Sequence, residues 1–131
     1  MRVLFVDDNA MNRLVVKSML SVAEVEMVEA QTAQVGLALI ETQPFDIVLM
    51  DFRMPGMDGL TAIRAIRARS DAQAHLPILM VTADDGVDLR ARALAAGADE
   101  LLLKPVQMQP LFDAIAIVMA LERRGPGYLA L

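Results

Sequence analysis

The sequence predicts an α/β fold of the flavodoxin-like (βα)5 type, a three-layer sandwich in which helices cover both faces of a parallel five-stranded sheet. Short apolar runs alternate along the chain with segments of helical periodicity, which is typical of parallel sheets. Four of the runs end on a charged or hydroxyl residue, and open α/β sheets bind ligands at the carboxyl ends of their strands. With right-handed crossovers, we expect the strand order 2-1-3-4-5.

The first two strand–helix units are expected within residues 2–42. Residues 2–6 form an apolar run typical of a buried strand. A weaker strand is expected at 25–29, followed by a helix at 32–42 in which Gly36 lowers the intrinsic stability by up to ~1 kcal/mol relative to Ala. The helix between the two strands is predicted from helical spacing of Met11, Leu14, Val15, Ser18 and Val22.

The third unit is a strand at 46–50, a loop and a helix. Pro55, Gly56 and Gly59 mark the loop, and Asp58 can cap the helix that follows. The helical positions are Leu60, Ile63, Ile66 and Arg67.

Two further units complete the predicted sheet. Pro77 opens a strand at 78–81, and a short Ala-rich helix at 87–96 is stopped by Gly97. The last strand is 100–103. The last helix runs from about Gln107 to Arg123, with Leu111, Ile115, Val118 and Glu122 on successive turns, and Gly125-Pro126-Gly127 ends it.

Composition limits the partners and the compartment. With 131 residues we expect one domain, 1–123, followed by a tail or linker start at 124–131. Twelve basic residues against 17 acidic ones give a net charge of −5, which argues against direct nucleic-acid binding. The absence of Cys excludes a disulfide framework. The longest late apolar stretch is far short of the ~20 residues of a membrane span, and the first strand leaves no room for a signal peptide, so a soluble cytoplasmic domain is expected.

Residues at the ends of the predicted strands could form one site: Asp7, Asp8, Asp51, Thr82 and Lys104. Taken alone, each has an ordinary interpretation as a helix cap, a solvated charge or a strand residue. Together, three carboxylates repel one another by about 4 kcal/mol per pair at ~4 Å and an effective dielectric of 20, so the cluster needs a cation. Oxygen ligands without His or Cys indicate Mg²⁺.

A site of this composition can handle a phosphoryl group. A carboxylate can attack phosphorus and form an acyl phosphate, while Mg²⁺ and Lys104 neutralise the phosphoryl oxygens. The Thr82 hydroxyl and the Ala83 backbone N–H could donate to the same oxygens. Pro105 can fix the chain direction after Lys104 through a cis bond.

At these positions the chain resembles the receiver domain of bacterial response regulators, over residues 2 to about 121. The segments that carry the resemblance are VLFVDDN, DIVLMDFRMPGMDG, PILMVTA and AGADELLLKPV. A further segment, DDNAMNRLVV, resembles receivers within hybrid sensor histidine kinases.

The resemblance implies a phosphoacceptor signalling switch rather than a turnover enzyme. A sensor histidine kinase or a histidine phosphotransfer protein would donate the phosphoryl group from a phosphohistidine to Asp51, and autodephosphorylation could follow. Asp8 would bind Mg²⁺ directly and Asp7 mainly through water, while Asp51 and the backbone carbonyl of Arg53 would complete the protein ligands.

The route from the site to the surface departs from the family pattern. The resemblance implies that Lys104 and Thr82 contact the phosphoryl group and carry the signal outward to an effector that the sequence does not identify. Family members commonly have Tyr or Phe three residues before the Lys, and here that position is Leu101. The usual coupling through an aromatic ring is therefore in doubt.

Two surface features have alternative interpretations. The last helix is apolar on more than one face, which fits a deep core contact or, as in similar receivers, a homodimer through 87–96, 100–103 and 107–123. Arg53 and Asp84 could meet at the mouth of the cleft as an ion pair that gates water and tunes dephosphorylation. They could equally be two unrelated solvated charges, since exposed pairs contribute ~0–1 kcal/mol.

Two other function classes fit less well. A phosphohydrolase of the haloacid-dehalogenase kind needs a second Asp two residues after the nucleophile, where this chain has Arg53. A pseudo-receiver that only binds partners would have a broken acidic site, and here the site is intact.

Overall fold

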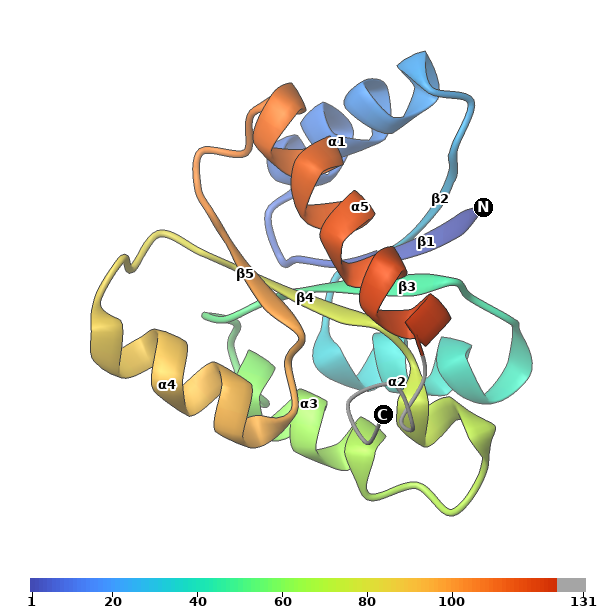
Figure 1. The fold of residues 1–131 in the computed structure, drawn as a ribbon, viewed down its shortest axis with the longest axis vertical. Coiled ribbons are helices and arrows are strands. Elements are labelled where there is room, and N and C mark those ends of the chain that lie inside the picture. The colour runs from blue at the N-terminus through green and yellow to red at the C-terminus, as the bar shows by residue number, and fades with distance from the viewer. Residues whose placement is uncertain (125–131) are drawn as a thin grey trace.

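A computed structural model of the chain describes residues 1–124, of which 122–124 are described as helix backbone alone. It confirms the predicted class and topology, because all five strands are parallel and follow the order β2-β1-β3-β4-β5 (Figure 1). The strands are β1 (Arg2–Val6), β2 (Glu26–Ala30), β3 (Ile47–Asp51), β4 (Ile78–Thr82) and β5 (Glu100–Leu103). The helices are α1 (Ala10–Val22), α2 (Ala33–Thr42), α3 (Gly59–Arg67), α4 (Val87–Ala96) and α5 (Met108–Arg124), with a short 3-10 helix, η1 (Ala72–His75).

The helices form two layers, one on each face of the sheet (Figure 1). α1 and α5 pack on one face around Phe5 and Leu111, and α2, α3 and α4 pack on the other around Leu4 and Ile63. Every residue of β3 and β4 is buried, because the central strands of a parallel sheet are covered on both sides. This burial explains their uninterrupted apolar runs and leaves only the strand ends for chemistry.

The first helix is confirmed, but the residues whose spacing predicted it are not the ones that it buries. Its buried residues are Val16 and Leu20, which pack against β1 and α5. The periodic positions Met11, Leu14, Val15, Ser18 and Val22 are exposed instead. Apolar residues lie around much of this helix, so periodicity alone could not decide which side faces the sheet.

Three boundaries near the strand ends differ from the predictions. Asp51 and Thr82 are the last residues of their strands rather than the first loop residues, so the sheet fixes both backbones. Gly59 begins α3 rather than belonging to the loop. Within α2, a Cβ on Gly36 would come 2.7 Å from a methyl carbon of Val6, so the glycine allows a close approach of helix and sheet.

The described residues test only part of what the sequence predicts about the C-terminal end and about membrane spans. The predicted stop at Gly125-Pro126-Gly127 and the tail beyond it lie outside the described residues. Along the described part of the chain, no helix combines the length and the apolar character that crossing a membrane requires.

Candidate functional site

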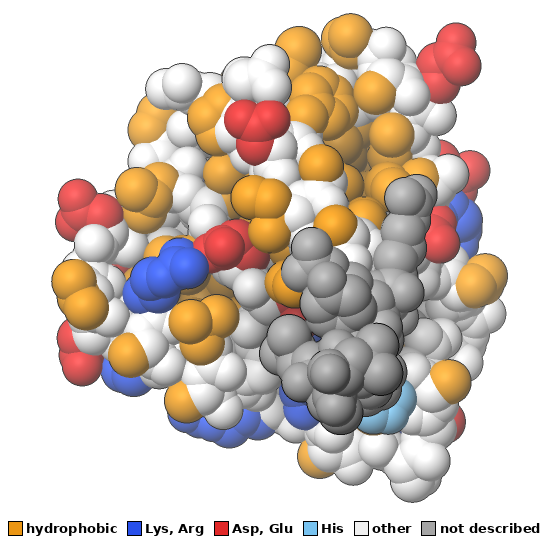
Figure 2. Space-filling model, in the orientation of Figure 1, with side chains coloured by type: hydrophobic (Ala, Val, Ile, Leu, Met, Phe, Trp, Pro, Cys, Tyr) orange, Lys and Arg blue, Asp and Glu red, His pale blue; other side chains and the backbone are white. Residues whose placement is uncertain are grey.

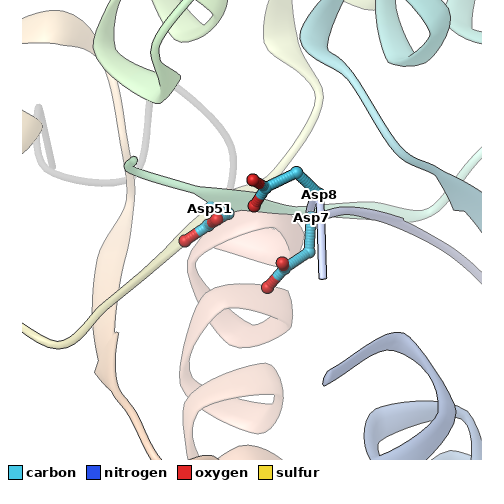
Figure 3. A group of neighbouring side chains, drawn as sticks. All are labelled: Asp7, Asp8 and Asp51. Carbon is cyan, nitrogen blue, oxygen red and sulfur yellow. The ribbon is translucent and has the colours of Figure 1, made fainter. Parts of the chain in front are cut away.

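The carboxyl ends of β1 and β3 bring three carboxylates together. Val6 pairs with Met50 in the sheet, so the residues that follow them, Asp7 and Asp51, lie side by side. One carboxylate oxygen from each of Asp7, Asp8 and Asp51 lies within 4.8 Å of the other two (Figure 3). Asp7 and Asp51 are buried whereas Asp8 is exposed. The acidic side chains predicted to share a site therefore do lie together.

The first turn of α1 holds Asp7 in place. Its Oδ1 accepts a hydrogen bond from the Asn9 backbone N–H at 2.8 Å, and its Oδ2 accepts one from the Asn12 side-chain amide at 3.3 Å. Nη1 of Arg13 donates to the Asp7 carbonyl oxygen at 2.7 Å. Sequence reasoning missed Asn12 and Arg13, although two adjacent polar residues in the first turn of the helix, directly after the acidic strand end, were a usable signal.

Lys104 places a positive charge against the carboxylates. It follows β5, and its backbone N–H donates to the Thr82 carbonyl at 2.8 Å. Its Nζ lies 2.8 Å from Asp51 Oδ1 and 3.2 Å from Asp7 Oδ2. The bond from Lys104 to Pro105 is cis, the form considered from the sequence. Burial lowers the pKa of Lys104, but the hydrogen bond to Asp51 and the two carboxylate charges outweigh it, so the pKa lies above its ordinary value.

Burial raises the pKa of Asp51 from 3.8 to about 6. The hydrogen bond and the charge of Lys104 act in the opposite direction, while the charges of Asp7 and Asp8 add to the rise. A single half-buried cation, Lys104, thus compensates only part of the charge of three carboxylates. Any additional cation at this edge of the sheet would favour the ionised form of Asp51.

The donor set fits a hard divalent cation. Every candidate side-chain ligand is a carboxylate oxygen, which Mg²⁺ and Ca²⁺ prefer. Asp8 makes no hydrogen bond or ion pair with the described residues, so both of its oxygens are available to a ligand. Asp7, by contrast, already uses both oxygens.

Thr82 ends β4 with its side chain buried. Its hydroxyl oxygen accepts a hydrogen bond from the Asp84 backbone N–H at 3.0 Å, and this contact does not use the hydroxyl proton. Ala83, next in the chain, is exposed. The end of β4 therefore places a buried hydroxyl, whose proton is available for donation, next to an exposed residue.

Arg53 and Asp84 are both exposed and have different partners. The guanidinium carbon of Arg53 lies 5.2 Å from the centroid of the Phe52 ring, and Asp84 Oδ1 accepts a hydrogen bond from the Gly86 N–H at 2.8 Å. No ion pair joins Arg53 to Asp84 in the described structure, and the gating hypothesis stays a prediction.

The face beside β5 and α5 is partly apolar. Leu101, at the position of the expected aromatic, is half-buried and packs against the core between the sheet and the α2–α4 layer. It also lines a hollow of about 480 Å³ together with Leu103, Pro110 and Ile117. Leu103 and Ile117 are about half exposed, with 46% and 51% of their surface accessible.

Comparison with known proteins gives consistent matches. Residues 3–116 match the family model described as the response regulator receiver domain. The sensor protein GacS of Pseudomonas syringae pv. syringae is 36% identical over 127 residues, which cover 95% of this chain and 14% of GacS. The chemotaxis protein CheY of Pseudomonas aeruginosa is 34% identical over 116 residues, which cover 88% of this chain and 93% of CheY.

Solved structures agree with these matches. The receiver domain of a sensor histidine kinase from Pseudomonas aeruginosa PAO1 has a TM-score of 0.82 and 29% identity, covering 91% of this chain and 97% of that one. That structure has a magnesium ion coordinated in the active site cleft. The chain thus spans nearly the whole of some relatives, but only about one seventh of the sensor protein GacS, at 14%.

Proposed function

The chain belongs to the response regulator receiver domain family, the signalling modules of two-component systems, and on this premise we propose that it is a phosphoacceptor switch. Asp51 takes a phosphoryl group from a phosphohistidine of a sensor histidine kinase or a histidine phosphotransfer protein. The observation that carries the proposal is the setting of Asp51, a buried carboxylate 2.8 Å from Lys104 Nζ and grouped with two further carboxylates.

The proposed transfer uses Asp51 as a nucleophile. A pKa of about 6 leaves the carboxylate mostly ionised at neutral pH and more basic than an ordinary Asp. One of its oxygens attacks phosphorus, the new O–P bond forms as the N–P bond breaks, and the electron pair goes to the imidazole, which takes up a proton. Lys104 Nζ pairs with Asp51 before the transfer and donates to a phosphoryl oxygen after it. Thr82 and the Ala83 N–H supply further donors.

Mg²⁺ is the proposed cofactor. Asp8, with both oxygens available, and Asp51 would bind it directly, and Asp7 would act mainly through water because its oxygens already have partners. The backbone carbonyl of Arg53 is the remaining proposed ligand. The bound ion would neutralise negative charge on the phosphoryl oxygens. The magnesium found in the cleft of the related kinase receiver domain supports this assignment.

Incubation with acetyl phosphate and Mg²⁺ is expected to add one phosphoryl group to the protein, detected as intact mass. The Asp51→Asn variant should lose the adduct because an amide does not attack phosphorus. Asp88→Asn is the matched control, since Asp88 is an exposed carboxylate on α4, and it should retain the adduct. A chelator should suppress the reaction in the unchanged protein and in Asp88→Asn. An adduct of unchanged yield in Asp51→Asn would disprove the assignment of the acceptor.

Arg53→Ala and Asp84→Ala are each expected to shorten or lengthen the lifetime of the phosphorylated form by several-fold, if the two charges control access of water. Lifetimes follow from the decay of the mass adduct after the donor is removed. A lifetime unchanged in both variants would leave the alternative, two unrelated solvated charges.

Phosphorylation is further proposed to change a partner surface on α4, β5 and α5. Leu101 lacks the aromatic ring of the usual coupling, so Thr82 and its loop would carry the change. A homodimer through residues 87–96, 100–103 and 107–123 stays a prediction, as does a cytoplasmic location. The similarity to the sensor protein GacS supports a receiver module of a hybrid kinase as the domain context.

A further inference from the structure

A second apolar hollow lies between α5 and the segment that joins α1 to β2, and we propose that it binds residues 128–131 of this same chain, Tyr-Leu-Ala-Leu. The hollow measures about 350 Å³ and shares no lining residue with the one beside β5. The proposal goes beyond the phosphoacceptor function and does not depend on it.

Every residue that lines the hollow has an apolar side chain. α5 contributes a stripe of residues one and two turns apart, and the other wall comes from the start of the chain and from the segment that joins α1 to β2. Hydrophobic side chains gather between α1 and α5 on the face shown in Figure 2. An apolar side chain that entered this hollow would be removed from water, which is favourable. The lining residues include Ala23, Val25, Phe112, Ala116, Met119 and Ala120.

The chain supplies a matching segment directly beyond the hollow. α5 ends at Arg124, four residues after Ala120, and Gly125-Pro126-Gly127 follows. Proline lacks the N–H that would continue a helix, and glycine accepts the positive φ that a reversal needs. After a reversal, the next residues would run back along the stripe of α5 toward Phe112.

The length of the segment 128–131 matches the length of the apolar stripe on α5. Four extended residues span about 13 Å at ~3.3 Å each, and the stripe from Ala120 to Phe112 rises about 12 Å at 1.5 Å per residue. Leu129 and Leu131, two apart in an extended segment, would face the same wall. The ring of Tyr128 would cover the rim with its hydroxyl in water, as amphipathic aromatic side chains do.

Tyr128 gives a specific readout, because it is the only Tyr in a chain without Trp. Intrinsic fluorescence therefore reports on this segment alone. In the full chain, we expect acrylamide to quench Tyr128 with a constant about twofold lower than in the Ala116→Glu variant, where a charge enters the hollow. Ala116 is exposed in the middle of α5, so Glu keeps the helix. Ala120→Glu is a second variant with the same expected result.

Ala91→Glu is the matched control, since Ala91 is exposed in the middle of α4 and outside the hollow. In Ala91→Glu, acrylamide should quench the Tyr128 fluorescence with the same constant as in the unchanged chain. Circular dichroism verifies that all variants keep their helices. Equal quenching of the unchanged chain, Ala116→Glu, Ala120→Glu and the urea-unfolded chain would overturn the proposal. Protection of Tyr128 from acrylamide that disappears when the protein is diluted would also overturn the proposal, because the segment in the hollow would then come from a second copy of the chain.

Discussion

Asp51→Asn is expected to be more stable than the unchanged protein at pH 7.5 in a chelating buffer. The pKa of Asp51 is about 6 in the folded protein against 3.8 for an unperturbed carboxyl, so the folded state binds this proton more tightly than the unfolded chain. Above pH 6 the proton is absent, and ionised Asp51 destabilises the fold by up to about 3 kcal/mol at 1.36 kcal/mol per pKa unit. Asn keeps the shape, removes the charge and leaves Lys104 paired with Asp7 at 3.2 Å. We therefore expect a gain of about 1–3 kcal/mol in the free energy of unfolding.

The sign of the pH dependence separates this effect from a general improvement in packing. Because the folded-state pKa of Asp51 is raised, the destabilisation is full above about pH 6 and vanishes as the pH falls toward 4. Urea unfolding across this range should show the advantage of Asp51→Asn shrinking steadily. An advantage that stays constant over the range would contradict the explanation.

Asp58→Asn is the matched control for this substitution. Asp58 caps α3, and the hydrogen bond from the Thr61 backbone N–H to its side chain, 2.8 Å long, is the main reason that its pKa is lowered rather than raised. Asn caps helices about as well as Asp but lacks the charge that the lowered pKa shows to be favourable, so we expect a small loss of stability at neutral pH that disappears as the pH falls toward 4, the opposite sign to Asp51→Asn. The free energy gained in Asp51→Asn should be absent here.

Gly59→Ala is expected to lose about 2–3 kcal/mol of stability and most of its phosphorylation by acetyl phosphate. A Cβ at this position would overlap the Asp51 carbonyl oxygen and come 2.9 Å from the Cα of Phe52. Both neighbours are backbone, so no rotamer change relieves the contact. The start of α3 or the end of β3 must shift, and the Gly59 N–H to Phe52 carbonyl hydrogen bond, 2.8 Å long, shifts with it. The carboxylate of Asp51 would then leave its position beside Lys104.

Gly36→Ala is the comparison for that variant. A Cβ there meets a methyl carbon of Val6 rather than backbone, and Ala raises helix propensity by up to ~1 kcal/mol. Its net loss of stability should be clearly smaller, with phosphorylation retained. Urea unfolding gives the stabilities, and the rate of the mass increase gives the phosphorylation. A Gly59→Ala protein as stable and as reactive as Gly36→Ala would show that the close approach to Asp51 is unimportant.

Sequence patterns predicted the strands well and the helix faces unevenly. Helices cover both faces of β3 and β4, so each of these strands has a continuous apolar run that identifies it in the sequence. α5 has Leu111, Ile115 and Val118 buried as expected. The first helix carries apolar residues on several sides, and only its packing against β1 and α5 shows that Val16 and Leu20 are the buried ones.

Side-chain partners were harder to predict than strand ends. Arg67 was expected only as the last position of its helix, yet it donates to the carbonyl oxygens of Ala74, Leu76 and Gly97 and pairs with Asp99 at 3.1 Å. These partners lie seven to 32 positions away along the chain. No local pattern encodes such distances, because they depend on how α3 meets the neighbouring elements.

The sequence by itself determined the expected strand order, the strand ends and the types of residue that lie there. The reason is that the carboxyl ends of parallel strands lie at the same edge of the sheet whatever the details of packing. Only the tertiary structure decided which groups hold those residues. It tied both oxygens of Asp7 to the start of α1 and to Lys104, gave Asp8 no hydrogen bond or ion pair among the described residues, and buried Asp51 deeply enough to raise its pKa to about 6. Burial and pairing depend on contacts between distant segments, and such contacts exist only once the sheet and both helix layers have assembled.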